Sequence, residues 1–493
     1  MKILYLIEKF GNKLPDPSFL FVVGTFLIFI LSAIISNMQY SAIDPNGNPI
    51  IVKNLMSSDG VWWFLSEMIE NFVLFPPLGI VLVGMLGIGF AEKTGFIPAL
   101  LDFIIQKIHQ KILTPITIFL GILSSIALDA GYVVLIPLAA TLYISAGRSP
   151  LLGIAVAFAG VSAGFGANIF ITALDPLLAG FTQLGAQILD KNYVVAVTAN
   201  WWFMIASTIL LTFVGWYVSE NFVAPSAKST LIKKNDIKKL PKKNNPALLY
   251  SSLTTICLLI IFYLLTVIEN APLFGNGKHF ERWVEVTVPL LFIIFFIPGL
   301  IYGVINKNIS NTHDIAIMLG EVLSKLGPYI VLAFFASQFI AAFNYSGLGY
   351  ILAISGGDFL KNLGIENSIL LSCFVLMAVF VNLFIGSSSA KYAFFAPVFV
   401  PMLMQIGISP ELTQVSYRIG DSVSNVITPM NPYMIIILME VKKYVRGSGL
   451  GTVISMMLPY TFSFLISWLF LLVLWMEMGW PLGPGGGLAY VLP

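Results

Sequence analysis

Five ionisable side chains lie within segments that are otherwise strongly apolar, and their types make them the first candidates for chemistry in this chain. Each costs about 2.5–3.5 kcal/mol to place at the centre of a membrane, so residues of this kind usually have a function. Two are cations and three are carboxylates, so complete pairing leaves one negative charge for a proton or a bound cation to neutralise. The five are Asp129, Asp175, Lys391, Arg418 and Asp421.

Arg418 and Asp421 lie three residues apart, nearly one turn of a helix. The guanidinium of Arg418 is a planar fork of five donors that suits a carboxylate. Asp421 is interpreted either as the partner of Arg418 or as a group that takes up a proton, and both roles can alternate. Upstream, Ser387, Ser388 and Ser389 follow a glycine in an apolar run. Their hydroxyls can cap a helix or bind a substrate, and both interpretations stay open.

These residues belong to two related segments, 129–162 and 389–422, which are identical at nine of 34 positions with a fixed offset of 260. Both segments are polar islands interrupted by glycine and proline. Paired segments of this kind in two halves of a membrane protein indicate a transporter binding site. The differences are also informative, because Gly131, Phe158 and Val161 stand opposite Lys391, Arg418 and Asp421.

A second pair of segments, 162–176 and 418–432, carries glycines and prolines that break helices. With one gap allowed, Asn168 aligns with Asn425, and Asp175 aligns with Asn431. A break in mid-membrane frees carbonyls for a cation and leaves a half-helix N-terminus that favours an anion. A kink that only aids packing is the alternative. Ion coupling is therefore predicted at Asp129, Asn168, Asp175, Asp421, Asn425 and Asn431, with Na⁺ near Asn168, Asp175 and Asn425.

The composition places the chain in a lipid bilayer. Of 493 residues, 58% are hydrophobic and 10% are charged, and the mean hydropathy is +0.90. A chain of this kind needs lipid as its solvent. The two cysteines and three histidines form no metal-ligand pattern. No cofactor, cleavable signal or nucleic-acid partner is expected.

Apolar runs of about 18 or more residues predict nine membrane spans. Two longer regions, 112–146 and 365–404, are each predicted to be a re-entrant hairpin of two half-helices, because polar residues interrupt them. The fold class is therefore an all-α polytopic membrane protein, with halves 1–223 and 248–493 joined by a basic linker at 224–247. The predicted spans lie near 18–37, 76–93, 150–180, 193–218, 248–268, 285–305, 325–345, 411–436 and 450–476. Those at 150–180 and 411–436 are expected to be broken.

The basic residues predict the orientation of this arrangement. With the N-terminus in the cytoplasm, 19 of the 26 lysines and arginines lie on the cytoplasmic side and five lie outside. The C-terminus is then periplasmic or extracellular. The first hairpin enters the membrane from the inside and the second from the outside, so the repeats have inverted topology, as in many secondary transporters.

Several motifs together resemble the AbgT family of bacterial p-aminobenzoyl-glutamate transporters and related sulfonamide antimetabolite exporters. They are GNKLPDP, SSIALDAGYVVLIPLAA, GFGANI…ALDPLLAG, SSSAKY and YRIGDSVSNVITPMNPY, and the resemblance covers about residues 5–476. It implies a homodimer in the bacterial inner membrane with an elevator-like scaffold and core. It also implies functional positions at Asp175, Ser389, Tyr392, Arg418, Asp421 and Pro429. Tyr392 stands where the family more usually has Trp.

The residues and the resemblance together predict a secondary active transporter of p-aminobenzoyl-glutamate or related aromatic carboxylates and sulfonamides. A proton or sodium gradient would drive it, by symport or antiport, and the direction stays open. An ion-coupled transporter of dicarboxylates or other organic anions is the alternative. Tyr392 would stack on the substrate ring. The predicted substrate-binding residues are Ser387, Ser388, Ser389, Lys391, Tyr392, Arg418, Asn425, Thr428 and Pro429.

Other classes agree less well with the sequence. No Walker motif is present for an ATP-driven pump. An aspartyl intramembrane protease needs a Gly-x-Gly-Asp motif, and Arg418 occupies its first position here. Clustered ionisable residues and unwound helices favour alternating access over a channel.

Overall fold

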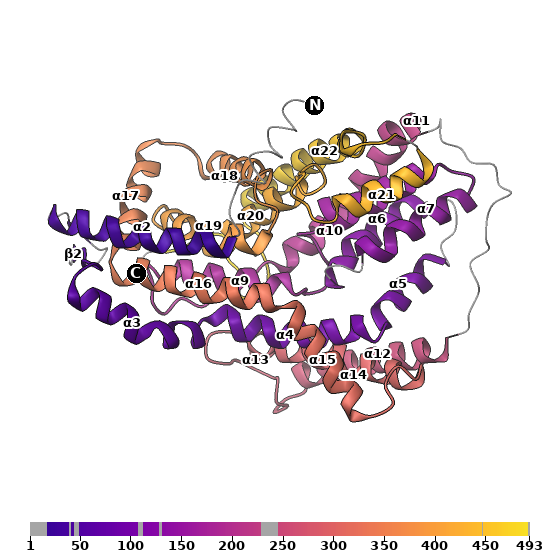
Figure 1. Ribbon diagram of the computed structural model, residues 1–493, viewed down its shortest axis with the longest axis horizontal. Coiled ribbons are helices and arrows are strands. Elements are labelled where there is room, and N and C mark those ends of the chain that lie inside the picture. The colour runs from indigo at the N-terminus through magenta and orange to yellow at the C-terminus, as the bar shows by residue number, and fades with distance from the viewer. Residues whose placement is uncertain are drawn as a thin grey trace.

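The computed structural model describes residues 17–38, 41–43, 49–106, 112–127, 131–227, 245–445 and 447–491. Its fold is built from helices, which confirms the predicted all-α class (Figure 1). One short antiparallel pair of strands, β1 (Ser41–Ile43) and β2 (Pro49–Ile51), follows the first helix. Asp129, most of the GNKLPDP motif and residues 228–244 of the basic linker lie outside the described residues.

The N-terminal half contains the first hairpin and the first broken helix. The hairpin consists of α6 and α7, and the broken helix consists of α8 and α9. Its helices are α2 (Pro17–Asn37), α3 (Ser58–Val73), α4 (Pro76–Lys93), α5 (Phe96–Gln106), α6 (Leu113–Leu123), α7 (Ile136–Ser145), α8 (Pro150–Phe158), α9 (Leu174–Ala186), α10 (Trp201–Val218) and α11 (Ala224–Ala227).

The C-terminal half repeats the order of hairpin and broken helix. Here the hairpin consists of α18 and α19, and the broken helix consists of α20 and α21. Its helices are α12 (Pro246–Val267), α13 (Arg282–Glu285), α14 (Thr287–Ile305), α15 (Thr312–Lys325), α16 (Gly327–Tyr345), α17 (Leu348–Asn362), α18 (Asn367–Asn382), α19 (Ser388–Met404), α20 (Pro410–Val423), α21 (Met434–Tyr444) and α22 (Leu450–Glu477).

Seven helical stretches of the described chain are long and apolar enough to cross a membrane. The predicted spans at 150–180 and 411–436 are absent from this set because each is interrupted. The first is irregular between its π-helical turn at 159–163 and Leu174, and the second between Val423 and Met434. The seven stretches are Ser18–Asn37, Ser58–Lys93, Trp201–Ala227, Pro246–Val267, Thr287–Ile305, Gly327–Tyr345 and Leu450–Glu477.

Two predicted span boundaries differ from the structure. In the structure, the span expected at 76–93 is the second part of a helical stretch that begins at Ser58. The first part, α3, was not predicted because its acidic residues lower the hydropathy of the segment and because Pro76 and Pro77 interrupt the apolar run. The span expected at 193–218 begins only at Trp201. The preceding residues form turns, in which the side chain of Gln187 donates to the carbonyl of Tyr193 at 3.0 Å.

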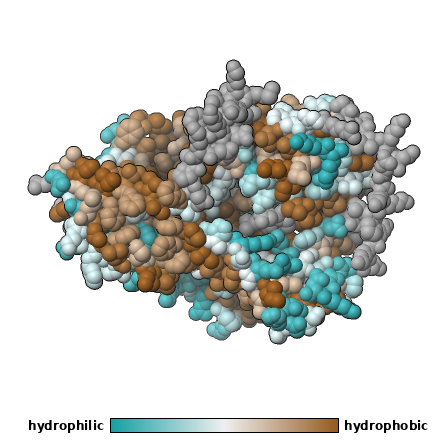
Figure 2. All heavy atoms as spheres, in the orientation of Figure 1, coloured by the Kyte–Doolittle hydropathy of each residue, from teal (hydrophilic) through white to brown (hydrophobic). Residues whose placement is uncertain are grey.

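Two bodies of helices lie on either side of the centre of the molecule (Figure 1). On the left, α16 packs against α2 and α3. On the right, α10 packs against α6 and α22. Apolar side chains cover much of the left body in Figure 2, as expected for a surface that faces lipid.

Each broken helix packs closely against the first helix of its own hairpin through a glycine. A Cβ at Gly160 would lie 2.5 Å from the carbonyl oxygen of Ile118 on α6. A Cβ at Gly420 would lie 2.5 Å from the carbonyl oxygen of Val375 on α18. Small residues permit such approaches between membrane helices. Steric contact therefore explains one of the nine repeat identities.

Candidate functional site

A cavity of about 560 Å³ lies between the tip of the second hairpin and the body formed by α2 and α16. One wall contains backbone and hydroxyls of the hairpin tip together with amides of the second unwound segment. The opposite wall contains residues of α2, α15 and α16. The lining residues are Ser18, Tyr132, Phe165, Lys325, Pro328, Tyr329, Leu332, Gly386, Ser387, Ser388, Ser389, Ala390, Asn425, Asn431, Pro432 and Tyr433.

The hairpin tip presents the N-terminus of α19 to this cavity. Gly386 precedes it, and a Cβ there would lie 2.3 Å from the carbonyl oxygen of Met430, so only glycine allows the approach. Ser387 caps the helix, because its hydroxyl accepts from the amide of Ala390 at 3.3 Å. An N-terminus with its unpaired amides favours a bound anion.

Ser388 and Ser389 follow the cap. The hydroxyl oxygens of Ser387 and Ser389 are 3.3 Å apart. The hydroxyl of Ser388 is buried and has no hydrogen-bond partner among the described residues, whereas its carbonyl accepts from Tyr417 at 2.6 Å. A buried hydroxyl without a partner destabilises the folded protein, because the hydrogen bonds that it makes to water in the unfolded chain are not replaced.

Aromatic residues from both repeats contribute to the cavity. Tyr132 follows the tip of the first hairpin, and Tyr433 follows the second unwound segment. Their rings are stacked, with centroids 4.0 Å apart and planes 9° from parallel. Phe165 and Tyr329 add further aromatic surface. The cavity therefore combines flat apolar surface with a polar helix terminus.

Arg418 is buried behind the cavity and bound to the first repeat. Its Nη1 atom is 2.6 Å from Oδ1 of Asp175. Its Nε and Nη2 atoms donate to the carbonyl oxygen of Gly166, at 3.1 and 2.8 Å. The other oxygen of Asp175 accepts from the amide and hydroxyl of Thr172. The contacts of this guanidinium with the described residues thus lie within the first unwound segment and the start of α9.

The interpretation of Asp421 as the partner of Arg418 is corrected by the structure. Asp421 pairs with Lys391, whose Nζ lies 2.6 Å from its Oδ1. The two side chains leave α20 in different directions, Arg418 toward α9 and Asp421 toward α19. Lys391 also contacts the side-chain oxygen of Asn382. Of the five ionisable residues singled out in the sequence, the four that are described therefore form two separate buried pairs.

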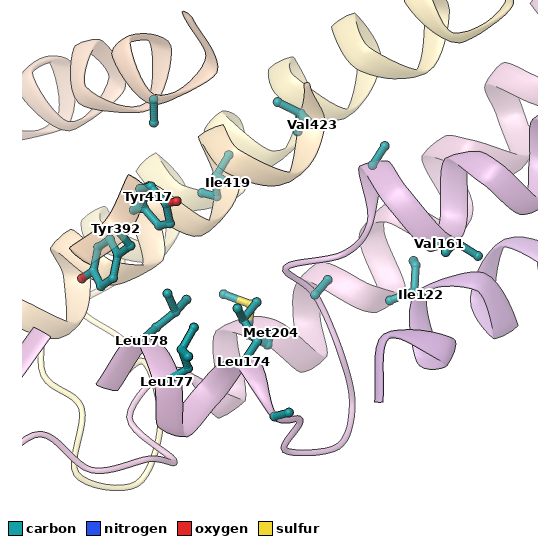
Figure 3. Close-up of a cluster of buried hydrophobic side chains, with 14 of the residues drawn as sticks. Ile122, Val161, Leu174, Leu177, Leu178, Met204, Tyr392, Tyr417, Ile419 and Val423 are labelled. Carbon is teal, nitrogen blue, oxygen red and sulfur yellow. The ribbon is translucent and has the colours of Figure 1, made fainter. Parts of the chain in front are cut away.

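Two tyrosines from neighbouring helices lie next to each other in the buried core (Figure 3). Tyr392 on α19 and Tyr417 on α20 have ring centroids 4.4 Å apart. The hydroxyl of Tyr392 is 2.6 Å from that of Thr182, which donates to Gln414 at 2.7 Å. The hydroxyl of Tyr417 donates to Oδ1 of Asp421 at 3.3 Å. Tyr392 is fully buried in this network and does not line the cavity.

The unwound segments hold their asparagines in separate clusters. Asn168 donates to Ser125 at 2.9 Å and to the carbonyl of Ile122 at 3.2 Å. Asn425 accepts from Asn382 at 2.9 Å. Asn168 and Asn425 therefore occupy equivalent places in the repeat. Each is bound to the hairpin of its own half, Asn168 to the first and Asn425 to the second.

Each repeat also contacts the unwound segment of the other through a serine at equivalent positions. Ser162 accepts from Asn431 at 3.2 Å. Ser422 accepts from the amide of Gly166 at 2.8 Å. These two serines are identical in the sequence repeat, and their reciprocal contacts explain why. The repeats are joined where their backbones are unwound.

The remaining predicted positions flank the second unwound segment. Thr428 is buried, and its hydroxyl donates to the carbonyl of Leu383 at 3.1 Å. Pro429 follows it and is half-buried. Of the predicted substrate-binding residues, Ser387, Ser388, Ser389 and Asn425 line the cavity, and the other five do not.

Sequence reasoning missed Asn382, Tyr132 and Tyr433. Asn382 donates to Asn425, Ser424 and the carbonyl of Asp421, and it is a lone amide in the apolar run before the serine tip. Tyr132 is one of the nine repeat identities. Asn382 and Tyr132 therefore each carried a signal in the sequence, although neither is charged.

Comparisons with known proteins agree with the motifs. Residues 2–490 match the model of the AbgT putative transporter family. The p-aminobenzoyl-glutamate transport protein of Escherichia coli (strain K12) is 32% identical over 489 residues, which cover 98% of this chain and 96% of that protein. The family resemblance drawn from the sequence is confirmed. The family consists of transporters rather than enzymes.

Two solved structures are similar throughout. The Alcanivorax borkumensis YdaH transporter, which has an unusual topology, is 38% identical with a TM-score of 0.91, covering 95% of this chain and 100% of that one. Neisseria gonorrhoeae MtrF, from a class of antimetabolite efflux pumps, is 39% identical with a TM-score of 0.88, covering 98% and 100%.

Proposed function

Because this chain belongs to the AbgT putative transporter family, we propose that it is a secondary active transporter of aromatic carboxylates in the bacterial inner membrane. Its substrates would be p-aminobenzoyl-glutamate or related carboxylates and sulfonamide antimetabolites, and a proton or sodium gradient would drive the transport. The names of the similar proteins support this choice, since one is a p-aminobenzoyl-glutamate transport protein and another belongs to antimetabolite efflux pumps.

The observation that carries the proposal is the cavity at the second hairpin tip. Its volume of about 560 Å³ is within the range of sites that hold small organic ligands. The N-terminus of α19 favours a carboxylate, and the stacked Tyr132 and Tyr433 offer a flat surface to an aromatic ring. An aromatic carboxylate satisfies both features, whereas an aliphatic dicarboxylate leaves the aromatic surface unused.

The proposed site residues have two kinds of role. Ser387, Ser388, Ser389 and Asn425 line the cavity and would contact the substrate directly. Lys391, Tyr392, Arg418, Thr428 and Pro429 would act from behind, by holding the hairpin and the unwound segments in place. Arg418 is already satisfied by Asp175 and Gly166, so it would reach a substrate only after those contacts break.

Ion coupling would use the polar groups around the unwound segments. Asn168 and Asn425 lie among carbonyl and hydroxyl oxygens, the ligands that Na⁺ accepts. Asp175, Asp421 and Asn431 would contribute further oxygens near one or other of the two unwound segments. In the alternative of proton coupling, Asp175 or Asp421 would take up the proton and release its cationic partner. Asp129 would belong to this group from the first hairpin.

The two walls of the cavity suggest how access alternates. The wall of α19 packs mainly against α9, α17 and α20, whereas in the opposite wall α16 packs mainly against α2 and α3, and α15 against α4. We propose that these groups of helices move past each other as core and scaffold, in a homodimer. With the N-terminus in the cytoplasm, the cavity opens toward the cytoplasmic side, where Lys325 lies.

Transport in proteoliposomes tests the proposal. The purified protein is reconstituted, and uptake of labelled p-aminobenzoyl-glutamate is measured under a pH gradient and, separately, under a sodium gradient. We expect saturable uptake, inhibition by unlabelled substrate, and stimulation by one of the gradients. Uptake that neither gradient stimulates would refute secondary active transport. Preference for an aliphatic dicarboxylate would support the alternative substrate class.

A further inference from the structure

Lys325 is the one charged side chain among the described residues that line the cavity. It ends α15, immediately before the turn into α16. Its side chain is 63% exposed. Among the described residues, its one ion-pair partner is Glu92, whose Oε1 is 3.8 Å from its Nζ, longer than a hydrogen bond. The ammonium can therefore meet a ligand that enters the cavity.

The cations of the repeat are in the opposite situation. The side chains of Lys391 and Arg418 are each 1% exposed, and each is paired with a carboxylate. Removing either from its partner leaves an unpaired charge in a medium of low dielectric constant, which is costly. An anion that enters the cavity therefore meets Lys325 before it can meet Lys391 or Arg418.

Lys325 and the hairpin tip line the same cavity from different helices, α15 and α19. The N-terminus of α19, capped by Ser387, supplies partial positive charge on one wall. The ammonium of Lys325 supplies a full positive charge on the other. A substrate that carries two carboxylates can place one at each wall. The cavity then recognises the separation of the two charges as well as their sign.

The two contacts belong to different helical groups. Lys325 is on α15, which packs against α4, whereas Ser387 precedes α19, which packs against α9 and α17. If the hairpin moves with α9 and α17 as proposed above, it leaves Lys325 behind. The contact with Lys325 is thus available only when the cavity opens as it does here.

We propose that Lys325 is a specificity-determining residue that captures the carboxylate of the substrate on the side to which this cavity opens. This role rests on the proposed function of carboxylate transport. The first charged side chain that the substrate meets then lies outside the sequence repeats. It also makes substrate recognition different at the two faces of the membrane.

The test compares uptake kinetics at the two faces in membrane vesicles of opposite orientation. We expect Lys325→Gln to raise KM for p-aminobenzoyl-glutamate about three- to tenfold at one face, with the maximal rate unchanged. Lys325→Arg should restore the KM of the unaltered protein. Added salt should raise KM in the unaltered protein and have less effect in Lys325→Gln, because ions screen the attraction.

Lys93→Gln is the matched control. Lys93 ends α4 and pairs with Glu321, but it does not line the cavity. We expect it to leave KM unchanged at both faces. Equal KM values for Lys325→Gln and the unaltered protein at both faces would overturn this inference while leaving the proposed function intact. Absence of uptake by the unaltered protein would refute the proposed function and this inference with it.

Discussion

The carboxylate of Asp175 and the guanidinium of Arg418 lie 2.6 Å apart, although they come from different halves of the chain. Asp175 is at the start of α9, and Arg418 is in the middle of α20. Both side chains are almost fully buried. The same guanidinium also binds the carbonyl of Gly166 in the first unwound segment. This pair therefore joins the two broken helices where the first is unwound.

Removing one partner of this pair should destabilise the protein strongly. Asp175→Asn or Arg418→Gln leaves a buried charge without its counter-ion, at a cost of about 3–5 kcal/mol. The double variant removes both charges and should regain most of that loss. Thermal unfolding in detergent measures the four proteins. Strictly additive losses in the double variant would contradict a direct ionic contact.

Transport separates the stabilising role of this pair from its functional role. We expect uptake of p-aminobenzoyl-glutamate to fail in all three variants, including the double variant, because the proposed cycle needs charges that can separate. Uptake by the double variant near the level of the unaltered protein would show that the pair is only a structural contact.

Two neighbouring serines at the hairpin tip should respond differently to the same substitution. Ser387 caps α19, so Ser387→Ala should lower stability by about 1 kcal/mol. Ser388 has a buried hydroxyl without a partner, so Ser388→Ala should leave stability unchanged or slightly raised. If the hydroxyl of Ser388 binds the substrate, KM should nevertheless rise in this variant.

Unfolding temperatures and uptake kinetics of the two serine variants test this contrast. Because the residues are adjacent and the substitution is the same, each variant is the control for the other. A loss of stability in Ser388→Ala equal to that in Ser387→Ala would show that its hydroxyl has a protein partner. An unchanged KM in Ser388→Ala would remove it from the substrate-binding set.

The sequence was a good guide to where the backbone breaks and a poor guide to which side chains meet. Glycine and proline act locally, so the breaks before Leu174 and after Val423 could be predicted from single segments. Ionic pairing depends on how the segments are turned toward each other. The spacing of Arg418 and Asp421 suggested a pair on one helix, but each binds a different neighbouring segment.

The same limit explains why the cavity differs from the predicted site. The sequence directed attention to charged residues, yet Lys391 and Arg418 are paired and buried behind the cavity. Apart from Lys325, the described residues that line it are uncharged residues, mainly of the hairpin tip, and aromatic rings. Charges in a membrane protein are expensive to expose to lipid, so a paired, buried position is the stable one. Uncharged residues that line the cavity carry no such energetic cost, so they stand out less clearly in the amino-acid sequence.

The stacked pair of Tyr132 and Tyr433 should determine the preference for aromatic substrates. Tyr433→Ala removes one ring from the cavity and the support of the other, and stacking contributes about 0.5–1.5 kcal/mol. We expect KM for p-aminobenzoyl-glutamate to rise about two- to tenfold. Tyr433→Phe keeps the ring and serves as the control, with a KM near that of the unaltered protein.

Competition by an aliphatic dicarboxylate tests whether this effect is specific to the aromatic ring. Inhibition by glutamate, which lacks a ring, should change little between the unaltered protein and Tyr433→Ala. An equal loss of affinity for both compounds would indicate that the substitution disturbs the cavity as a whole and that the stack does not select aromatic substrates.

The glycines at equivalent positions of the repeats should be intolerant of even a methyl group. In Gly420→Ala, the new Cβ would lie 2.5 Å from the carbonyl oxygen of Val375 and 2.6 Å from the side chain of Ala378, so α20 must move away from α18. Overpacking of this kind costs about 1–3 kcal/mol. Because α20 carries Arg418 and Asp421, the displacement also disturbs both buried pairs.

Gly320→Ala is the matched control, since Gly320 is in α15 and a Cβ there meets nothing within 4 Å. Replacing glycine with alanine in an open helical position stabilises by about 0.5–1 kcal/mol. We therefore expect Gly420→Ala to lower the unfolding temperature and the rate of uptake, and Gly320→Ala to leave uptake unchanged. If Gly420→Ala unfolds at the temperature of the unaltered protein, close packing is not the reason for this repeat identity.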